Sequence, residues 1–365
     1  MKIAVLGAGN MGCAVAADLS HKGHEVTLIK TSTVNFETLH GENFRYLCEN
    51  SGKIEMWSEN SQYSPYVTNI SCVTDDISVI SAMDLIYIAV VTNFHETFIQ
   101  KISPYLQNGQ IVLIVPGYLS TVYFLKYCKN ISNITIVEGE SSPIDCRITA
   151  PGKVRVGFMN VRNPVGCYTA ENLSKIREKL DSLQHNFEYL GSVAEAALQN
   201  PNLIVHTVGA IMSIPRIEKT NGDYCMYWEV FTPAVWNILE KLDSEKMQIL
   251  QKLGLPAVAY VDACKHRNSL DDSRAAKDVF MEYAASPFRA KGPTSLESRY
   301  IMEDVPQGLV LLESLAKSLK IAVPTATALI ELANAALLRD FRAEGRTIEK
   351  LGLENVQKIL KIKEN

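Results

Sequence analysis

The chain has 365 residues, of which 47% are hydrophobic and 21% are charged, and its formal net charge at pH 7 is −4. This apolar fraction excludes a disordered chain, and the slight acidic excess argues against a nucleic-acid binder that relies on charge alone. The length fits two domains of ordinary size. The eight cysteines form no Cys-x-x-Cys pair, so no metal site is expected, and reduced thiols in a cytoplasmic protein are the default.

Two apolar stretches have to be distinguished from membrane signals. Residues 1–19 begin with a lysine and an apolar run, as a signal peptide does, but three glycines and Asp18 argue against that interpretation. Residues 321–338 contain a proline, a glutamate and an asparagine, which fits a buried helix better than a bilayer span. No membrane partner is therefore expected.

The first half of the chain alternates apolar strand patterns with helical patterns. The pattern predicts a strand at 2–6 that enters a glycine turn, a helix at 11–21, and further strands at 25–29, 84–91, 110–115 and 134–138. Continuous apolar runs separated by helices are typical of parallel strands covered on both faces, as in a doubly wound sheet. Segments 153–160 and 187–190 are expected to extend that sheet around a helix at 172–183.

After residue 190 the strand signals fade and helical patterns follow one another. The predicted helices lie at 194–197, 203–214, 233–253, 275–284, 306–319 and 325–342. We therefore expect an α/β Rossmann domain at 1–190 and an all-α domain at 191–365. The polar stretch 265–299, rich in charge, serine and proline, is expected to be a mobile connection or lid near a site.

The segment Gly7-Ala8-Gly9-Asn10-Met11-Gly12 fits the G-x-G-x-x-G pattern of dinucleotide-binding proteins. It follows a predicted strand and opens a predicted helix, which is the context that the motif requires. Gly7 permits the tight turn, Gly9 lets a pyrophosphate approach the backbone, and Gly12 lets helix and strand pack closely. The helix N-terminus, from Asn10 and Met11, supplies N–H groups for the phosphates.

The end of the second strand decides which nucleotide is favoured. An acidic residue there would bind the ribose 2′-hydroxyl of NAD(H), but this chain has Lys30 and Thr31 at that place. NADP(H) is therefore the favoured cofactor, with NAD(H) left open. Lys30 as a plain solvated surface lysine is the alternative.

His206 lies alone in an apolar helical run, where a histidine is more often a core residue than a catalyst. Asn202 lies four residues earlier, on the same helical face. Far downstream, Arg299 and Asp304 stand just before a helix. Asp304 could be only a helix cap there, and Arg299 only an ion-pair partner.

With these residues in view, the chain resembles the octopine/nopaline dehydrogenases, the opine dehydrogenase family. The resemblance runs in order along the chain and is carried by GAGNMG (7–12), IVLIVPG (111–117), ESSPIDCR (140–147), NPNLIVHTVGAIM (200–212), ESRYIMEDVP (297–306) and DFRAEGRTIEKLGL (340–353). It implies a Rossmann domain, an all-helical domain and an active site between them. It also implies reduction of the imine formed from an amino acid and a 2-oxo acid.

The same resemblance implies roles for individual residues. His206 corresponds to the catalytic proton donor and Asp304 to its carboxylate partner. Arg299 corresponds to the arginine that binds a substrate carboxylate, and Asn202 to an active-site amide. The chemistry suits these types, because an imidazole exchanges protons near neutral pH and a guanidinium binds a carboxylate with two parallel hydrogen bonds.

Further residues are expected near the cofactor or the substrate. The resemblance implies that Cys146 and Arg147 lie near the nicotinamide and the substrate, although either could be structural. Pro116 is expected to shape the loop beside the nicotinamide, and Val91 and Thr92 to border the nucleotide beyond a strand end. His95 is expected at the surface.

Two other functions stay open. A 2-oxo-acid reductase of the dehydropantoate type shares the two-domain plan but tends to use a lysine as proton donor. A non-catalytic NADP(H) sensor would keep the glycine loop without needing His206 and Asp304 to meet. The sequence names neither the amino acid nor the 2-oxo acid, and it leaves a homodimer open.

Overall fold

The computed structural model describes residues 1–33, 35–61, 63–129, 131–286 and 291–360. The chain divides into two compact units, Met1–Val193 and Ala194–Asn365. The sequence predicts that division at residue 190. None of the helices in these residues combines the length and the apolar character that a membrane span needs.

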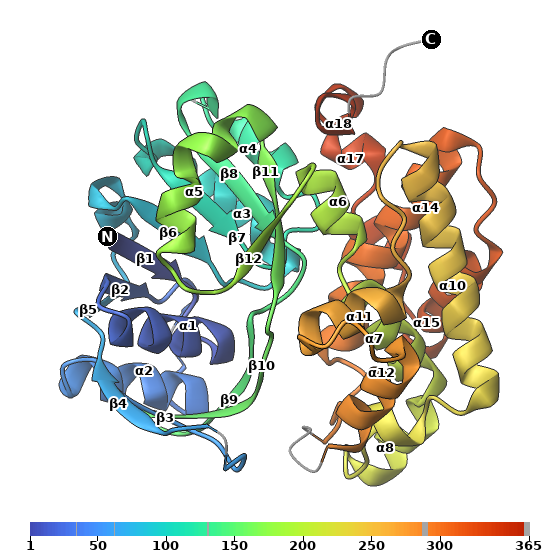
Figure 1. Ribbon diagram of the computed structural model, residues 1–365, viewed down its shortest axis with the longest axis horizontal. Coiled ribbons are helices and arrows are strands. Elements are labelled where there is room, and N and C mark those ends of the chain that lie inside the picture. Colours follow the sequence, from blue (N-terminus) through green and yellow to red (C-terminus); the bar gives the residue numbers. More distant parts are fainter. Residues whose placement is uncertain (34, 62, 130, 287–290, 361–365) are drawn as a thin grey trace. The chain divides into compact units, whose positions relative to one another are not determined.

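The first unit is built on an eight-stranded sheet with the order β12-β11-β8-β7-β6-β1-β2-β5 (Figure 1). The strands are β1 (Lys2–Leu6), β2 (Glu25–Ile29), β5 (Cys72–Thr74), β6 (Leu85–Ile88), β7 (Ile111–Ile114), β8 (Thr135–Gly139), β11 (Asn163–Tyr168) and β12 (Phe187–Leu190). The six strands from β5 to β8 are parallel, and β11 runs antiparallel to β8. Strand order reverses between β1 and β6, which is where ligands bind in such sheets. The predicted Rossmann-type sheet is confirmed.

A second sheet has the order β4-β3-β10-β9. Its strands are β3 (Lys53–Trp57), β4 (Tyr66–Asn69), β9 (Ile144–Ala150) and β10 (Lys153–Met159). The prediction that 153–160 extends the main sheet is therefore wrong. Buried residues alternate with more accessible ones along the first part of β10, as in a strand covered on one face, and β10 pairs antiparallel with β9.

Helix α1 (Asn10–His21) packs against strands of both sheets of the first unit. Its residues from Gly12 to Leu19 are all buried. A Cβ on Gly12 would lie 1.7 Å from the carbonyl oxygen of Gly7, so helix and turn can meet only because this residue is glycine. The longer helices after α1 are α2 (Leu39–Glu49), α3 (His95–Ile102), α4 (Thr121–Tyr127) and α5 (Leu173–Asp181).

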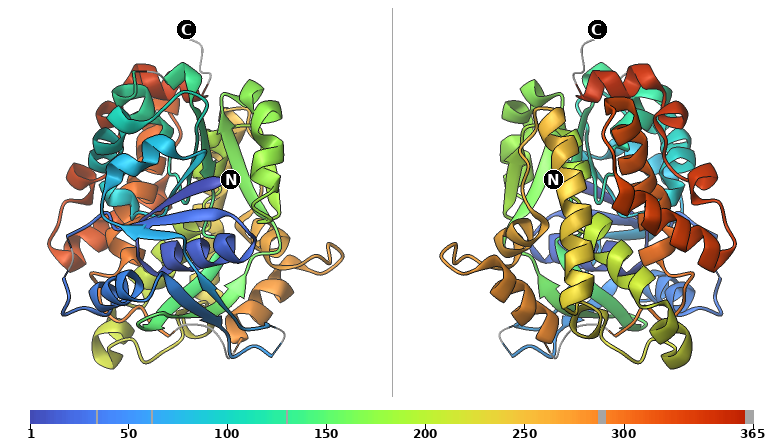
Figure 2. Two further views of the ribbon diagram at one scale, coloured as in Figure 1. Left: turned by 90° about the vertical axis from the view of Figure 1, so that its left-hand side faces the viewer. Right: turned by 90° about the vertical axis from the view of Figure 1, so that its right-hand side faces the viewer.

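The second unit is helical in its described residues, as predicted, with the long helix α10 in yellow in Figure 2. Its helices are α6 (Val193–Leu198), α7 (Asn202–Met212), α8 (Ile214–Thr220), α9 (Met226–Glu229), α10 (Pro233–Lys252), α11 (Tyr260–Asn268), α12 (Ala276–Ala285), α13 (Arg299–Met302), the π-helical turn η6 (Val305–Leu309), α14 (Val310–Leu319), α15 (Pro324–Leu337), α16 (Phe341–Glu344), α17 (Ile348–Leu351) and α18 (Leu353–Leu360).

One helix prediction in this unit needs correction. Within the polar stretch 265–299 the predicted helix 275–284 is present as α12, whereas the expected mobility of the stretch stays a prediction, and its residues 287–290 lie outside the described residues. The predicted helix 325–342 is interrupted at Leu338, which adopts a left-handed conformation with φ of 53° and ends α15.

A buried polar cluster ties the edge of the main sheet to α1. His185, just before β12, lies with Nε2 2.9 Å from Asp18 Oδ2, and Lys22 donates a hydrogen bond to the same oxygen at 2.7 Å. Burial lowers the pKa of His185, although the Asp18 carboxylate opposes this effect. The imidazole is therefore neutral in the folded protein around neutral pH, where it can donate from Nε2 to the carboxylate.

This cluster predicts a pH-dependent stability. As pH falls through about 6.5, the unfolded chain protonates at His185 while the folded unit does not, so the free energy of unfolding decreases. His185→Gln keeps a donor for Asp18 without titrating, and its urea unfolding should depend less on pH between 7.5 and 5.5. His21→Gln, at an exposed histidine of α1, is the matched control. Equal pH dependence of wild type and His185→Gln would contradict this prediction.

Candidate functional site

The glycine turn after β1 offers an open and uncapped helix N-terminus. Gly7 has φ of 111°, and a Cβ there would lie 2.7 Å from the carbonyl oxygen of Ala89. A Cβ on Gly9 would meet nothing within 4 Å, so the space beside this residue is open. Helix α1 has no side-chain cap and no acidic residue in its first turn. Its first N–H groups therefore suit a pyrophosphate.

Asn10 and Cys146 join this turn to the second sheet. Asn10 Oδ1 accepts a hydrogen bond from the Ile148 N–H at 2.8 Å, and its carbonyl oxygen accepts one from the Cys146 thiol at 3.4 Å. The side-chain oxygen of Asn10 is thus already used, and Cys146 is buried against the turn. Met11 is half-buried. Contacts of these three residues with ligands remain predictions.

Arg147 lies on β9 with a half-exposed side chain. Its guanidinium donates to the carbonyl oxygen of Cys146 at 2.7 Å and lies 3.6 Å from Asp145 Oδ1. The expected contact with a second substrate carboxylate remains a prediction.

Two groups that can carry positive charge lie near each other beyond the end of β2. Lys30 is half-buried, and burial lowers the pKa of its ammonium group. His40, in the first turn of α2, has a pKa lowered by burial and then by the charge of Lys30. In the part of the chain that the structure describes, neither forms an ion pair with a carboxylate. Thr31 follows Lys30 directly, and the sequence reasoning missed His40 because ten residues separate it from Lys30.

The loops after β6 and β7 are joined by His95. Val91 is exposed, whereas Thr92 is buried. His95 is fully buried, so its predicted surface position is wrong. Its Nε2 lies 2.9 Å from the Val90 carbonyl oxygen, to which it can donate, and its Nδ1 lies 2.6 Å from Ser120 Oγ.

The loop after β7 has no room for a side chain beside Pro116. A Cβ on Gly117 would lie 1.9 Å from Glu138 Oε2. The fully buried Glu138 carboxylate accepts hydrogen bonds from the backbone N–H groups of Leu119 and Thr121 and from the Thr121 hydroxyl, at 2.6 to 2.9 Å. These bonds hold the loop at the carboxyl end of the sheet.

In the second unit, His206 and Asp304 meet although 98 positions separate them in sequence. His206 Nδ1 lies 2.8 Å from Asp304 Oδ2, and both residues are buried. Burial lowers the pKa of His206, while the hydrogen bond and charge of Asp304 oppose this shift. Within the described residues Nε2 makes no hydrogen bond, so it is the ring atom left to exchange a proton.

The other predicted residues of this unit lie on the elements that carry the pair. Arg299 begins α13 with its side chain 51% exposed, and its Nε lies 3.1 Å from the buried carboxylate of Glu303. Asn202 begins α7, one turn before His206, and its backbone N–H donates to Asn200 Oδ1 at 2.9 Å. Tyr300, to which no role was assigned from sequence, stacks on the His206 ring.

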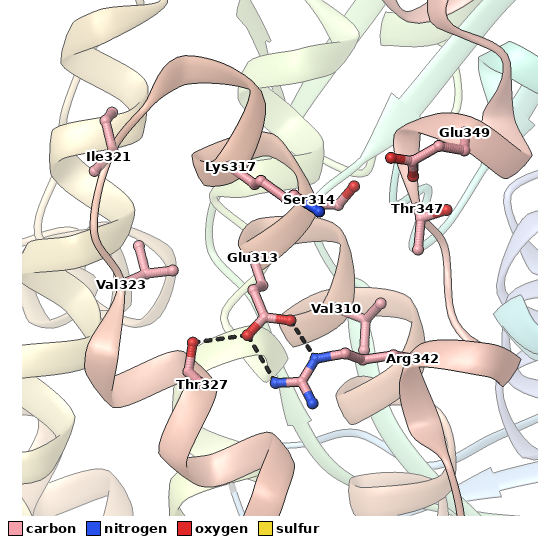
Figure 3. A pocket seen from close by; sticks show the side chains of 10 residues that line it. All are labelled: Val310, Glu313, Ser314, Lys317, Ile321, Val323, Thr327, Arg342, Thr347 and Glu349. Atoms are coloured by element: carbon pink, nitrogen blue, oxygen red, sulfur yellow. Dashed lines mark hydrogen bonds and ion pairs between the residues drawn. The ribbon is translucent and has the colours of Figure 1, made fainter.

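A separate cavity of about 430 Å³ opens between α14, α15 and the chain around α16 and α17 (Figure 3). The Glu313 carboxylate in it accepts hydrogen bonds from Arg342 and Thr327, and these bonds lower the pKa of Glu313. None of the residues to which the sequence analysis assigns a catalytic or binding role lines this cavity. Across the described residues, no cluster of histidine, cysteine and acidic side chains suits a metal ion.

Comparisons with known proteins place both units among dehydrogenases. Residues 189–337 match the family described as NAD/NADP octopine/nopaline dehydrogenase, alpha-helical domain, and residues 2–120 match the NAD-dependent glycerol-3-phosphate dehydrogenase N-terminus. An opine dehydrogenase from Arthrobacter sp. (strain 1C) is 28% identical over 362 residues, which cover 97% of this chain and 95% of that protein.

Solved structures show the same fold. An octopine dehydrogenase structure with NADH and L-arginine has a TM-score of 0.75 at 16% identity, covering 100% of this chain and 99% of that one. Yersinopine dehydrogenase with bound NADP+ has a TM-score of 0.70 at 16% identity, covering 100% and 95%.

Proposed function

We propose that this chain, an NAD(P)-dependent oxidoreductase of the opine dehydrogenase family, reduces the imine formed from an amino acid and a 2-oxo acid. The observation that carries this proposal is the buried His206–Asp304 pair, with Nε2 of the imidazole left to exchange a proton. The half-exposed Arg299, on the segment that leads to Asp304, supplies a cation for a substrate carboxylate.

A reduced nicotinamide dinucleotide, held by the glycine turn at Gly7, Gly9 and Gly12, would supply the hydride for the imine carbon. His206 delivers a proton from Nε2 to the nitrogen of the substrate, where negative charge would otherwise develop. The Asp304 carboxylate accepts a hydrogen bond from the Nδ1–H group of His206, which fixes the tautomer and stabilises the imidazolium before proton transfer. Arg299 orients the reacting carbon by binding the adjacent carboxylate. The product is a secondary amine with two carboxylates.

In this proposal residues 1–190 bind the dinucleotide and residues 191–365 bind the substrates and supply the proton. The glycine turn takes the pyrophosphate, because its open space at Gly9 and the uncapped start of α1 suit an anion. All eight cysteines are free thiols, which supports a cytoplasmic location.

The reaction type is tested by following NADPH oxidation with a panel of 2-oxo acids, such as pyruvate, with and without an amino acid. We expect turnover only when both substrates are present. Equal turnover with the oxo acid alone would indicate a 2-oxo-acid reductase. A lack of turnover with every pair, together with retained NADPH binding, would favour a nucleotide sensor.

His206→Gln tests the proton donor. We expect at least a hundredfold loss of kcat, in the lower range for lost acid–base catalysis, with the Kd for NADPH unchanged. His21→Gln, at an exposed histidine of α1, serves as the matched control and should keep both kcat and the Kd for NADPH. If His206→Gln keeps the wild-type kcat, then His206 is not the acid.

The preferred cofactor is NADP(H). The half-buried ammonium group of Lys30, next to Thr31, has no carboxylate partner among the described residues, and His40, a second half-buried basic group, lies near it in the first turn of an α-helix. A 2′-phosphate would compensate this charge, whereas the 2′-hydroxyl of NADH would not.

Lys30→Ala should raise KM for NADPH by about ten- to a hundredfold, because a charge-assisted hydrogen bond to phosphate is worth about 1.5–3 kcal/mol. KM for NADH should change little. Lys101→Ala, an exposed lysine of α3, is the control. A wild-type enzyme that prefers NADH, or equal losses for both cofactors in Lys30→Ala, would contradict this assignment.

A further inference from the structure

Tyr300 lies face to face with the imidazole of His206. The two ring centroids are 3.7 Å apart and the ring planes differ by only 8°. Carbon atoms in contact are about 3.5 Å apart, so the rings overlap with little lateral offset. The phenol thus covers one face of the ring whose Nδ1 edge faces Asp304.

This geometry is unfavourable for two uncharged rings. Neutral aromatic rings avoid a full face-to-face overlap, because the negative faces of both π systems meet, and their centroids are usually about 4.5–7 Å apart. A cation above a phenol face is attracted instead. The close overlap at Tyr300 therefore favours the protonated form of His206.

The spacing of residues in the segment 299–304 explains why two of its side chains contact the His206 ring. Tyr300 and Asp304 are four residues apart in a chain that is helical from α13 into η6, so they project from the same side. Tyr300 reaches the face of the imidazole and Asp304 reaches its edge. Arg299 and Glu303, also four apart, form the neighbouring ion pair.

We infer that Tyr300 is a positioning residue, which holds the imidazole of His206 in place and stabilises its protonated form so that Nε2 can deliver the proton. This inference rests on the proposed role of His206. Burial and the charge of Arg299 lower the pKa of His206, while Asp304 and Glu303 raise it. A ring face that stabilises the protonated imidazole therefore helps the buried ring to keep the proton that it donates. The face of Tyr300 adds a stabilisation that involves no further buried charge.

Two substitutions separate the ring face from the hydroxyl group. Tyr300→Phe keeps the aromatic face, and Tyr300→Leu removes it. We expect Tyr300→Phe to retain the wild-type pH profile of kcat/KM for reduction. In Tyr300→Leu the loss of activity at alkaline pH should begin about half a unit to one unit lower, because the acid deprotonates earlier.

A measurement without turnover separates this inference from the proposed function. Histidine 13Cε1 labelling gives seven imidazole signals, and the signal absent from His206→Gln identifies His206. Its pKa should be lower in Tyr300→Leu than in wild type, and unchanged in Tyr300→Phe. The melting temperature and the Kd for NADPH of each variant report on folding and cofactor binding.

Four outcomes decide between the inference and its alternatives. A lower His206 pKa in Tyr300→Leu alone supports the inference. An unchanged pKa in Tyr300→Leu, whatever happens to kcat, overturns it, and so does an equal drop in Tyr300→Phe, which would assign the effect to the hydroxyl group. Full activity in His206→Gln would instead refute the proposed acid while leaving the measured ring interaction as it is.

Discussion

The buried hydrogen bond between His206 and Asp304 is the constraint on which the second unit depends. A carboxylate with no exposed surface is costly unless it is paired, and removing one partner of such a pair typically costs about 3–5 kcal/mol. The fold therefore has to bring α7 and the α13–η6 segment together across 98 positions of sequence. The same contact thus contributes to the packing of the helical unit and sets the chemistry of the His206 ring.

The two proposed sites differ in how they treat charge. Around the glycine turn the described residues leave positive potential without a carboxylate, through the uncapped N–H groups at the start of α1 and the ammonium group of Lys30. The site around His206 pairs its charges closely, as His206 with Asp304 and Arg299 with Glu303. An anionic cofactor is attracted by the first arrangement, whereas controlled proton transfer needs the second.

Sequence reasoning found what local patterns encode. The glycine turn, the continuous apolar strands and the helical periodicity predict the main sheet and the helical unit, because these signals arise from steric fit and period. The second sheet was missed because β3 and β4 are short and half-exposed, and their pairing with β9 and β10 is a long-range choice. Burial of His95 was missed for a similar reason, since its partner Ser120 lies beyond another strand.

In the site, family resemblance pointed to His206, Asp304 and Arg299, but no sequence pattern shows that a neighbouring tyrosine covers the ring. The contact of Tyr300 with the ring depends on the rotation of about 100° per residue along the helix. One residue inserted between Tyr300 and Asp304 would rotate one of them by about 100° about the helix axis, so face and edge could no longer meet the same imidazole. The number of residues between Tyr300 and Asp304 is therefore itself a structural requirement, because any insertion or deletion there would separate the two contacts on the ring.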